Sequence, residues 1–264
     1  MGHDIVPIYT DLRNRSKLSK NIANLDFDAA INFAGISSTN HDDLSEIYSV
    51  NTVGAMNFIS AIHDSNNKSL KSMLLISSAH VYGNSQNLQY DESQITQPNN
   101  HYGASKLSME FLAQVYVNKL PIIIARPFNY TGPGQATNFV IPKLIHHFKN
   151  KKKKVELGNI EIEREFNDIR FVCEAYLALL EFGIPGETYN ICTGLTHSLK
   201  KIIHSIQDLS NHEINVVLNN DFLRSQEIHK LCGNPQKLNS ILDKAGVTKL
   251  KYKLEDTLLY MLET

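Results

Sequence analysis

Short, uninterrupted runs of apolar residues mark the strands of this chain. Residues 73–76 read Met-Leu-Leu-Ile and residues 121–125 read Pro-Ile-Ile-Ile-Ala, with no polar side chain in either run. Continuous apolar runs of this length are typical of strands buried on both faces of a parallel sheet. Residues 29–33, Ala-Ala-Ile-Asn-Phe, predict a further strand. The pattern therefore indicates an α/β protein with a parallel sheet.

Helical periodicity fills the stretches between these runs. Apolar residues recur three and four positions apart along residues 45–62 and again after Tyr102, and residues 250–262 predict a closing amphipathic helix. Residues 4–10, Asp-Ile-Val-Pro-Ile-Tyr-Thr, predict another strand. Pro7 favours an edge or weakly paired position there, because proline has no N–H to donate. Strands that alternate with helices predict a doubly wound, Rossmann-like sheet.

Composition adds only outer bounds to this picture. The 264 residues are 42% hydrophobic and 20% charged, which suits one large α/β domain or one domain with a smaller appendage. The net charge of −1 gives no electrostatic reason to expect a nucleic acid or a membrane as partner. The lysine-rich run at residues 149–154 is typical of a solvated loop. Cys173, Cys192 and Cys232 follow no metal-ligand pattern, so we expect reduced thiols, no bound metal and a cytoplasmic protein.

The residues that carry chemistry gather around the run at residues 73–76. Ser78 follows that run, and Tyr102 and Lys106 open the next helical stretch. Residues four apart share one side of a helix, and an ammonium there lowers the pKa of a tyrosine from its ordinary value of about 10. Tyr102 would then exchange a proton near neutral pH. The spacing alone is weak evidence in a chain with 11 tyrosines, but a serine that ends a buried strand lies where open α/β sheets bind ligands.

Ser78, Tyr102 and Lys106 together resemble the catalytic triad of the extended short-chain dehydrogenase/reductase family. Residues 126–135, Arg-Pro-Phe-Asn-Tyr-Thr-Gly-Pro-Gly-Gln, closely resemble a segment of GDP-mannose 4,6-dehydratases and GDP-4-keto-6-deoxy-mannose reductases, with Tyr130 in place of the usual histidine. The resemblance implies an enzyme that uses NAD or NADP and acts on a nucleotide sugar, with a GDP-sugar favoured. It also implies that the three residues named first are catalytic.

The same resemblance implies which residues surround the cofactor. Asp11 and Leu12 begin a motif that meets the adenine, and Asn51 stands where the family keeps an asparagine that supports the catalytic lysine. Taken alone, Asp11 is typical of a turn or cap residue, and Asn51 of an asparagine tolerated on a helix. The full set implied to bind the cofactor is Asp11, Leu12, Asn32, Ala34, Gly35, Asn51, Tyr102, Lys106 and Pro127.

A second set is implied to bind the substrate. Arg164 and Arg224 match two arginines that grip the nucleotide diphosphate in similar proteins, since a planar guanidinium suits phosphate oxygens. Both matches are imperfect, because Glu165 replaces an aspartate and no proline follows Arg224. The full set implied to bind the substrate is Ser78, His80, Asn129, Asn138, Arg164 and Arg224.

The resemblance also implies how the chain is divided. Residues 1–126 and 166–195 would form the dinucleotide-binding part, and residues 127–165 and 196–264 the smaller substrate-binding part. The family begins with a strand and a Gly-x-x-Gly-x-x-Gly turn that holds the cofactor pyrophosphate, and this sequence contains no such cluster. We therefore expect the first strands of the fold, roughly 50 residues, to be missing and the cofactor to bind weakly.

The residues next to Ser78 suggest the reaction. Dehydratases of the family carry an acid/base carboxylate within two residues of the catalytic Ser or Thr, and here Ala79 and His80 occupy those positions. The resemblance thus implies a reductase acting at C4 of a GDP-4-keto-6-deoxy-hexose. A 4-epimerase, a 4,6-dehydratase and a truncated, non-catalytic relic stay open as alternatives. The exact sugar, the choice between NAD and NADP, and a homodimeric state also stay open.

Overall fold

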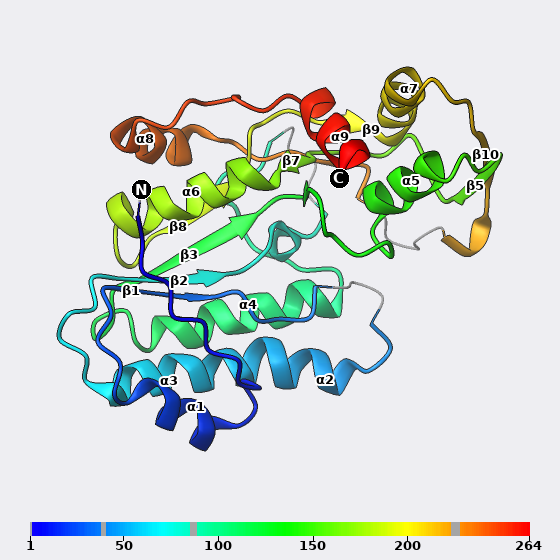
Figure 1. Ribbon diagram of the computed structural model, residues 1–264. Helices are drawn as coiled ribbons and strands as arrows, with labels where there is room; N and C mark the ends of the chain where they lie inside the picture. The colour runs from blue at the N-terminus through cyan, green and yellow to red at the C-terminus, as the bar shows by residue number, and fades with distance from the viewer. Residues whose placement is uncertain (1, 38–40, 85–88, 223–227) are drawn as a thin grey trace. The chain divides into compact units, whose positions relative to one another are not determined.

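The computed structural model describes residues 2–37, 41–84, 89–222 and 228–264, which divide into two compact units. The first unit comprises Met1–Gly83, Thr96–Ala125 and Gly183–Thr188; the second comprises Asn84–Ile95, Arg126–Phe182 and Tyr189–Thr264. Figure 1 shows the chain coloured from its N-terminus to its C-terminus, with many of the helices and strands labelled. Within the described residues, no helix is long and apolar enough to cross a membrane.

The first unit is built on a parallel sheet. Its elements are α1 (Arg15–Ile22), β1 (Ala29–Asn32), α2 (Leu44–Tyr48), the π-helical segment η1 (Ser49–Gly54), α3 (Ala55–Ser65), β2 (Ser72–Ile76), the 3-10 helix η2 (Ala79–Tyr82), α4 (His101–Gln114) and most of β3 (Ile122–Pro127). β2 pairs in parallel with β1 on one side and with β3 on the other. The segment Gly183–Thr188, which enters β8 (Thr188–Ile191), bonds to β3 through Ile122 and Ile124. The predicted α/β class with a parallel sheet is confirmed.

Alternate residues of the two central strands form the core of this unit. Met73 and Leu75 of β2, and Ile122 and Ile124 of β3, are at most 3% exposed and pack with side chains of α1, α3 and α4. Successive side chains on a strand point to opposite faces, so these four define the face that the helices cover. Burying one such side chain stabilises the fold by about 1.5–3 kcal/mol. The apolar runs of the sequence thus become the centre of the sheet.

The strand predicted for residues 4–10 is not formed. Residues 2–11 have no regular secondary structure, and Ile5 and Tyr9 are exposed. Pro7 has no N–H to donate to a ladder, and none of the described strands pairs with this segment. The prediction was wrong because an extended, apolar segment becomes a strand only where a neighbouring strand accepts its hydrogen bonds.

The helix predicted for residues 45–62 forms as α2, η1 and α3 in direct succession. Asp43 caps its start, with its carboxylate accepting a hydrogen bond from the amide of Glu46 at 2.9 Å. Asn66 ends it in the left-handed conformation that stops helices. The π-helical middle adds one residue to a turn, a feature that is frequent at functional sites. It carries Asn51.

The second unit joins short strand pairs to a helical core. Its elements are β4 (Tyr130–Thr131), α5 (Val140–Lys149), β5 (Lys154–Leu157), β6 (Glu163–Arg164), β7 (Asn167–Asp168), α6 (Ile169–Phe182), most of β8, β9 (His197–Ser198), α7 (Leu199–Ser210), β10 (Asn215–Leu218), η3 (Asn220–Phe222), β11 (Lys230–Leu231), α8 (Gln236–Ala245) and α9 (Leu254–Glu263). β5 pairs with β10, β6 with both β9 and β11, and β4 with β7. The helices α5, α7 and α9 pack around buried Leu144, Ile202 and Leu258. The predicted closing helix is therefore present as α9.

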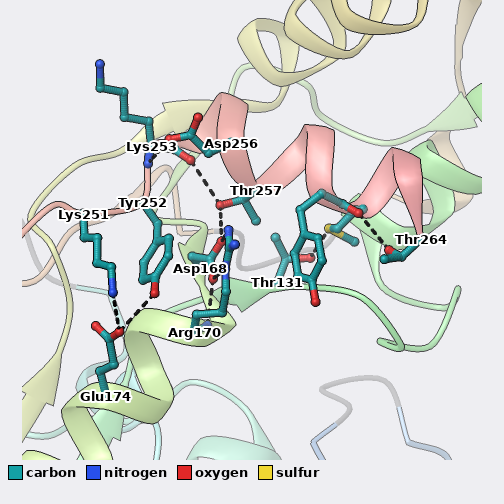
Figure 2. Close-up of polar contacts among 12 residues, drawn as sticks. Thr131, Asp168, Arg170, Glu174, Lys251, Tyr252, Lys253, Asp256, Thr257 and Thr264 are labelled. Atoms are coloured by element: carbon teal, nitrogen blue, oxygen red, sulfur yellow. Dashed lines mark hydrogen bonds and ion pairs between the residues drawn. The ribbon is translucent and has the colours of Figure 1, made fainter.

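A buried carboxylate anchors α9 (Figure 2). Asp168 accepts a hydrogen bond from the hydroxyl of Thr257 at 2.7 Å and two from the guanidinium of Arg170 at 2.7 and 2.9 Å. The guanidinium carbon of Arg170 lies 4.3 Å from the ring centroid of Tyr252 and 4.5 Å from that of Tyr260. Burial raises the pKa of Asp168, but hydrogen bonds from Arg170 and Thr257 outweigh it and leave the pKa below its usual value.

The compact units differ from the division expected from the sequence. Residues 84–95 belong to the second unit, and Tyr90 forms a bridge there with Gly233. The helix α6, which the sequence division assigned to the dinucleotide-binding part, also belongs to the second unit, where it packs against α8. The sequence division followed ligand roles, whereas compactness reflects which elements pack together.

Candidate active site

Ser78 lies two residues after the end of β2 and is 5% exposed. Its backbone is extended, and its Oγ accepts a hydrogen bond from the amide of His80 at 3.2 Å, which caps η2. Serine suits this position because its hydroxyl supplies the acceptor that the first amides of a helix lack. The cap fixes the turn that carries both residues at the carboxyl end of a parallel strand, where α/β sheets bind ligands.

Tyr102 and Lys106 lie in the first two turns of α4. The helix begins at Asn100, whose Oδ1 accepts a hydrogen bond from the amide of Gly103 at 2.8 Å. The ring of Tyr102 lies edge-on to that of His80, with 5.7 Å between their centroids. Glycine at position 103 permits this approach, because a Cβ there would lie 2.5 Å from the carbonyl oxygen of His80. The structure thus brings the turn after β2 beside the tyrosine.

Lys106 is 6% exposed and directed toward the end of β2. Its Nζ donates a hydrogen bond to the carbonyl oxygen of Ile76 at 2.9 Å. Burial disfavours the charged form and lowers the pKa of Lys106 from 10.5 to about 8. The amine therefore still carries its charge at neutral pH. A cation one helical turn from Tyr102 favours the phenolate form of that tyrosine.

Asn51 holds the loop that follows β1 against α4. Its Oδ1 accepts from the amide of Ile36 at 2.8 Å, and its Nδ2 donates to the carbonyl oxygen of the same residue at 2.9 Å. The Nδ2 also donates to the hydroxyl of Ser105 at 3.0 Å. A Cβ built on Gly35 would lie 3.1 Å from both Asn51 Oδ1 and Lys106 Nζ. Any side chain at position 35 would therefore fill the space beside the buried ammonium.

Ser105 is a site residue that the sequence did not reveal. It is fully buried, and its Oγ donates to the carbonyl oxygen of Tyr102 at 2.8 Å while accepting from Asn51. Its own carbonyl oxygen accepts from the hydroxyl of Thr52 at 3.0 Å. Two residues of the π-helical segment are therefore hydrogen-bonded to α4 at Ser105, one residue before Lys106. The sole sequence signal for this contact is a serine next to the lysine.

Asn32 shapes the start of the same loop. It ends β1, is 6% exposed, and accepts a hydrogen bond from the amide of Ala34 at 3.0 Å through its Oδ1. Such an Asx turn fixes the backbone without a partner strand. The residues that the first unit brings together around the carboxyl ends of β1 and β2 are Asn32, Ala34, Gly35, Asn51, Ser78, His80, Tyr102 and Lys106.

Asp11 and Leu12 serve two different purposes. The exposed carboxylate of Asp11 pairs with the guanidinium of Arg13 at 2.7–3.0 Å, and this hydrogen bonding holds the pKa of Asp11 below its ordinary value. Leu12 is 7% exposed and belongs to the hydrophobic core. Its carbonyl oxygen accepts a hydrogen bond from the side chain of Asn57 at 2.9 Å. The carboxylate of Asp11 thus stays at the surface, whereas Leu12 is held in the hydrophobic core.

Three predicted residues lie at the end of β3 and in the stretch after it, all in the second unit. Pro127 is the last residue of β3 and is buried. Asn129 is half-buried, and its carbonyl oxygen accepts from the amide of Asn167 at 2.9 Å. Asn138 lies in an exposed turn that precedes α5. The glycines and prolines between them keep this stretch out of regular helix, as the sequence predicts.

The guanidinium of Arg164 donates hydrogen bonds to backbone carbonyl oxygens of the second unit. Its Nη1 donates to the carbonyl oxygens of Glu163 and His229 at 2.8 and 3.1 Å, and its Nη2 donates to that of Ile228. These bonds tie β6 to the segment that enters β11. Arg224, the second arginine predicted to bind diphosphate, lies outside the described residues.

Glu165, which stands where similar proteins carry an aspartate, is fully buried. Its carboxylate accepts hydrogen bonds from the amides of Gly233, Thr193 and Gly194 at 2.6, 2.8 and 3.3 Å. Burial raises the pKa of Glu165, although these hydrogen bonds oppose the rise. The longer side chain thus joins three segments of the second unit beside Arg164.

A parallel α/β sheet with a serine after one strand and a tyrosine and a lysine four residues apart on the next helix is the arrangement of the extended short-chain dehydrogenase/reductase class. Residues 2–256 match the protein-family model described as GDP-mannose 4,6 dehydratase. The chain belongs to that family, and it is an enzyme of the nucleotide-sugar epimerase, dehydratase and reductase group. The family resemblance predicted from the sequence is confirmed.

Individual relatives narrow the comparison. The chain is 32% identical over 232 residues to GDP-6-deoxy-D-talose 4-dehydrogenase of Aggregatibacter actinomycetemcomitans, covering 88% of this chain and 79% of the relative. It is 30% identical over 206 residues to GDP-6-deoxy-D-mannose reductase of Pseudomonas aeruginosa, covering 75% and 67%.

Solved structures agree with this placement. RMD from Pseudomonas aeruginosa, complexed with NADPH, superposes with a TM-score of 0.88 at 28% identity, covering 98% of this chain and 88% of that one. UDP-glucuronic acid 4-epimerase from Bacillus cereus, in complex with UDP-glucuronic acid and NAD, superposes with a TM-score of 0.84 at 25% identity, covering 97% and 80%. The fold is thus shared with proteins that hold either form of the cofactor.

Proposed function

We propose that this chain reduces the C4 keto group of a GDP-4-keto-6-deoxy-hexose with NADPH or NADH. Two relatives whose names specify oxidation or reduction of GDP-6-deoxy sugars support the choice of substrate. The observation that carries the choice of reaction is the residue after Ser78. Ala79 is 1% exposed inside η2 and has no group that exchanges a proton.

Dehydration is the second candidate, because the matching family model bears that name. A 4,6-dehydratase must remove the C5 proton and expel the 6-hydroxyl, which requires an acid/base group beside the site in addition to the tyrosine. Ala79 cannot supply it, and His80 packs edge-on against Tyr102. Reduction of a preformed keto sugar needs neither step.

The three catalytic side chains divide the work at the keto oxygen. Ser78 donates a hydrogen bond that orients the C4 oxygen and stabilises charge developing on it. Tyr102 gives its hydroxyl proton to that oxygen, and the ammonium of Lys106 stabilises the phenolate that remains. When bound, the nicotinamide supplies the hydride; the protein contributes geometry and proton transfer.

The first unit offers features that suit such a cofactor. The space beside Gly35, which a Cβ would fill, adjoins the buried cation of Lys106. A ribose hydroxyl is a fitting partner for that cation and for the hydroxyl of Tyr102. We assign Asn32, Ala34, Gly35, Asn51, Tyr102, Lys106 and Pro127 to the nicotinamide side and Asp11 and Leu12 to the adenine side.

The substrate roles are assigned on the same basis. His80, Asn129 and Asn138 are assigned to the sugar. Arg164 and Arg224 are assigned to the diphosphate, for which guanidinium groups are suited. The guanidinium of Arg164 also donates to the backbone carbonyl oxygens of Glu163, His229 and Ile228.

The test supplies NADPH or NADH with GDP-4-keto-6-deoxy-mannose and follows both loss of the reduced cofactor and the mass of the sugar. We expect a product heavier than the substrate by two hydrogen atoms. In parallel, GDP-mannose is supplied with the oxidised cofactor. Loss of water from GDP-mannose would make the chain a dehydratase, and inversion at C4 without net redox change would make it an epimerase. Binding of the nucleotide sugar without any turnover would mark a non-catalytic protein.

A further inference from the structure

A second polar pair lies directly behind the catalytic serine. The hydroxyl of Ser77 donates a hydrogen bond to Oε1 of Glu110 at 2.5 Å. The two residues are 1% and 5% exposed. Neither belongs to the triad, and burying a carboxylate is costly unless it is hydrogen-bonded. The hydrogen bond from Ser77 offsets part of the cost of burying this carboxylate. An apolar residue at position 110 would avoid that cost altogether, so we expect the pair to serve a role of its own.

The location of the pair links it to all three catalytic residues. Ser77 immediately precedes Ser78 at the tip of β2, and Glu110 follows Lys106 by four positions and Tyr102 by eight on α4. Residues spaced by four lie above one another on one side of a helix. One side of α4 therefore carries the tyrosine, the lysine and the glutamate in succession.

The last residue of β2 and the residue that follows it are thus bonded to two successive turns of α4. The carbonyl oxygen of Ile76 accepts from Lys106, and the hydroxyl of Ser77 donates to Glu110. The amide of Ser77 also donates to the carbonyl oxygen of Ala125 at 2.7 Å, which ties the same residue to β3. The strand tip is therefore fixed along the helix axis as well as within the sheet.

The position of Ser77, one residue after β2, argues that the polar pair is a departure from simple apolar packing. Side chains alternate along β2, and Met73 and Leu75 face the core that includes Met109 of α4. Ser77 is the next residue on that face. An apolar side chain there would continue the row and pack without any hydrogen-bonding requirement, whereas serine demands a partner.

We propose that Ser77 and Glu110 form a positioning pair that holds Ser78 in register with Tyr102 and Lys106. Without it, the strand tip would be free to slide along α4, and a displacement near 1 Å in such a site costs about 10²-fold in rate. The pair is buried and belongs to neither set of residues assigned to the substrate or the cofactor, so its loss should lower kcat and leave KM nearly unchanged. This role rests on the proposed reductase function.

The test compares Ser77→Ala and Glu110→Leu, which each remove the bond, with Glu110→Gln, which keeps an oxygen that accepts from Ser77. We expect kcat to fall by roughly 10- to 100-fold in the first two variants, with a much smaller loss in Glu110→Gln. The double variant Ser77→Ala/Glu110→Leu should be no slower than the worse single one, because both remove the same bond. Ser60→Ala is the matched control, since Ser60 is also a buried serine, bonded to Tyr116 at 3.2 Å.

A readout independent of turnover separates this proposal from the proposed function. The ionisation of Tyr102 is followed by phenolate absorbance, as the difference between each variant and the same variant carrying Tyr102→Phe. Because the ammonium of Lys106 is bonded to Ile76, a strand tip that slides along α4 should shift this ammonium relative to Tyr102. The pKa of Tyr102 should then move toward its ordinary value of about 10 in Ser77→Ala and Glu110→Leu, and not in Ser60→Ala. If the unmodified chain reduces no keto sugar, the reductase assignment fails and this titration alone decides. An unchanged pKa of Tyr102 in Ser77→Ala and Glu110→Leu would overturn the positioning role. A fall in kcat no larger than the fraction of protein that is unfolded would also overturn it.

Discussion

The ammonium of Lys106 donates a hydrogen bond to the carbonyl oxygen of Ile76, the last residue of β2, at 2.9 Å. This bond places a buried cation at the strand end from which Ser78 emerges. Burial lowers the pKa of Lys106 to about 8, so the group is charged at neutral pH but loses its proton in mildly alkaline solution. Its titration therefore contributes to stability, and in the proposed mechanism the same ammonium also stabilises the phenolate of Tyr102.

Replacing Lys106 should change how stability depends on pH. In the unfolded chain the amine titrates near 10.5, so between about pH 8 and 10.5 the unfolded state binds more protons than the folded state. Folding stability contributed by this group therefore rises with pH across that window, by roughly 3 kcal/mol in total. Lys106→Met should lack this rise. The measurement is chemical unfolding from pH 7 to 10.5.

The exposed Lys17 supplies the control for that experiment, since Lys17→Met removes a lysine from the surface of the same unit. Other lysines and tyrosines also titrate at alkaline pH, and the difference between the two variants cancels their contribution. Parallel stability curves for both variants would show that Lys106 is not buried as a cation.

Removing the hydroxyl of Tyr102 should stop proton transfer while leaving the site folded. Tyr102→Phe is expected to lower kcat at least 10²-fold, a typical general-acid contribution, with a smaller change in KM. Steady-state kinetics with the keto sugar measure both. Tyr116→Phe, which removes a hydroxyl bonded to Ser60, should turn over normally. Near-normal turnover by Tyr102→Phe would remove the residue from the mechanism.

Asp168 should contribute to stability above the ordinary carboxyl pKa. Its pKa is lower when folded than the reference value of 3.8, so its stabilisation is complete above that pH and is lost as the pH falls through the folded pKa. Asp168→Asn weakens the bonds to Arg170 and Thr257 and should cost on the order of 2 kcal/mol at pH 7. The exposed Asp208→Asn is the control. Equal unfolding free energies for the two variants at pH 7 would contradict the anchoring role.

The parts of the fold that were predictable depend on local pattern. The runs at residues 73–76 and 121–125 became β2 and β3 because a strand buried on both faces has no polar positions. The helix that carries Tyr102 followed from the spacing of its apolar residues, and the structure adds a cap at Asn100 that was not part of that prediction. The strand predicted for residues 4–10 failed because pairing depends on a neighbour that the segment itself does not encode.

The supporting contacts of the site were hidden for a related reason. Ser105 and Glu110 are ordinary helix residues in the sequence, and their significance comes from Asn51 and Ser77 on other elements. A polar residue becomes buried and bonded only when a distant partner meets it. The spacing of Tyr102 and Lys106 and the family resemblance therefore predict a triad, whereas the buried contacts around its members could not be predicted.

The loop after β1 supplies the last prediction, which concerns the space beside Gly35. An added Cβ would lie 3.1 Å from Asn51 Oδ1 and from Lys106 Nζ, so one of them must move in Gly35→Ala. Overpacking of this kind costs about 1–3 kcal/mol of stability.

If the nicotinamide ribose uses this space, the affinity for NADPH should fall at least tenfold, or about 1.4 kcal/mol, relative to the unmodified chain. Titration calorimetry measures the affinity. Gly2→Ala, where a Cβ meets nothing within 4 Å, is the control. An unchanged affinity for NADPH in Gly35→Ala, with the expected loss of stability, would place the cofactor elsewhere.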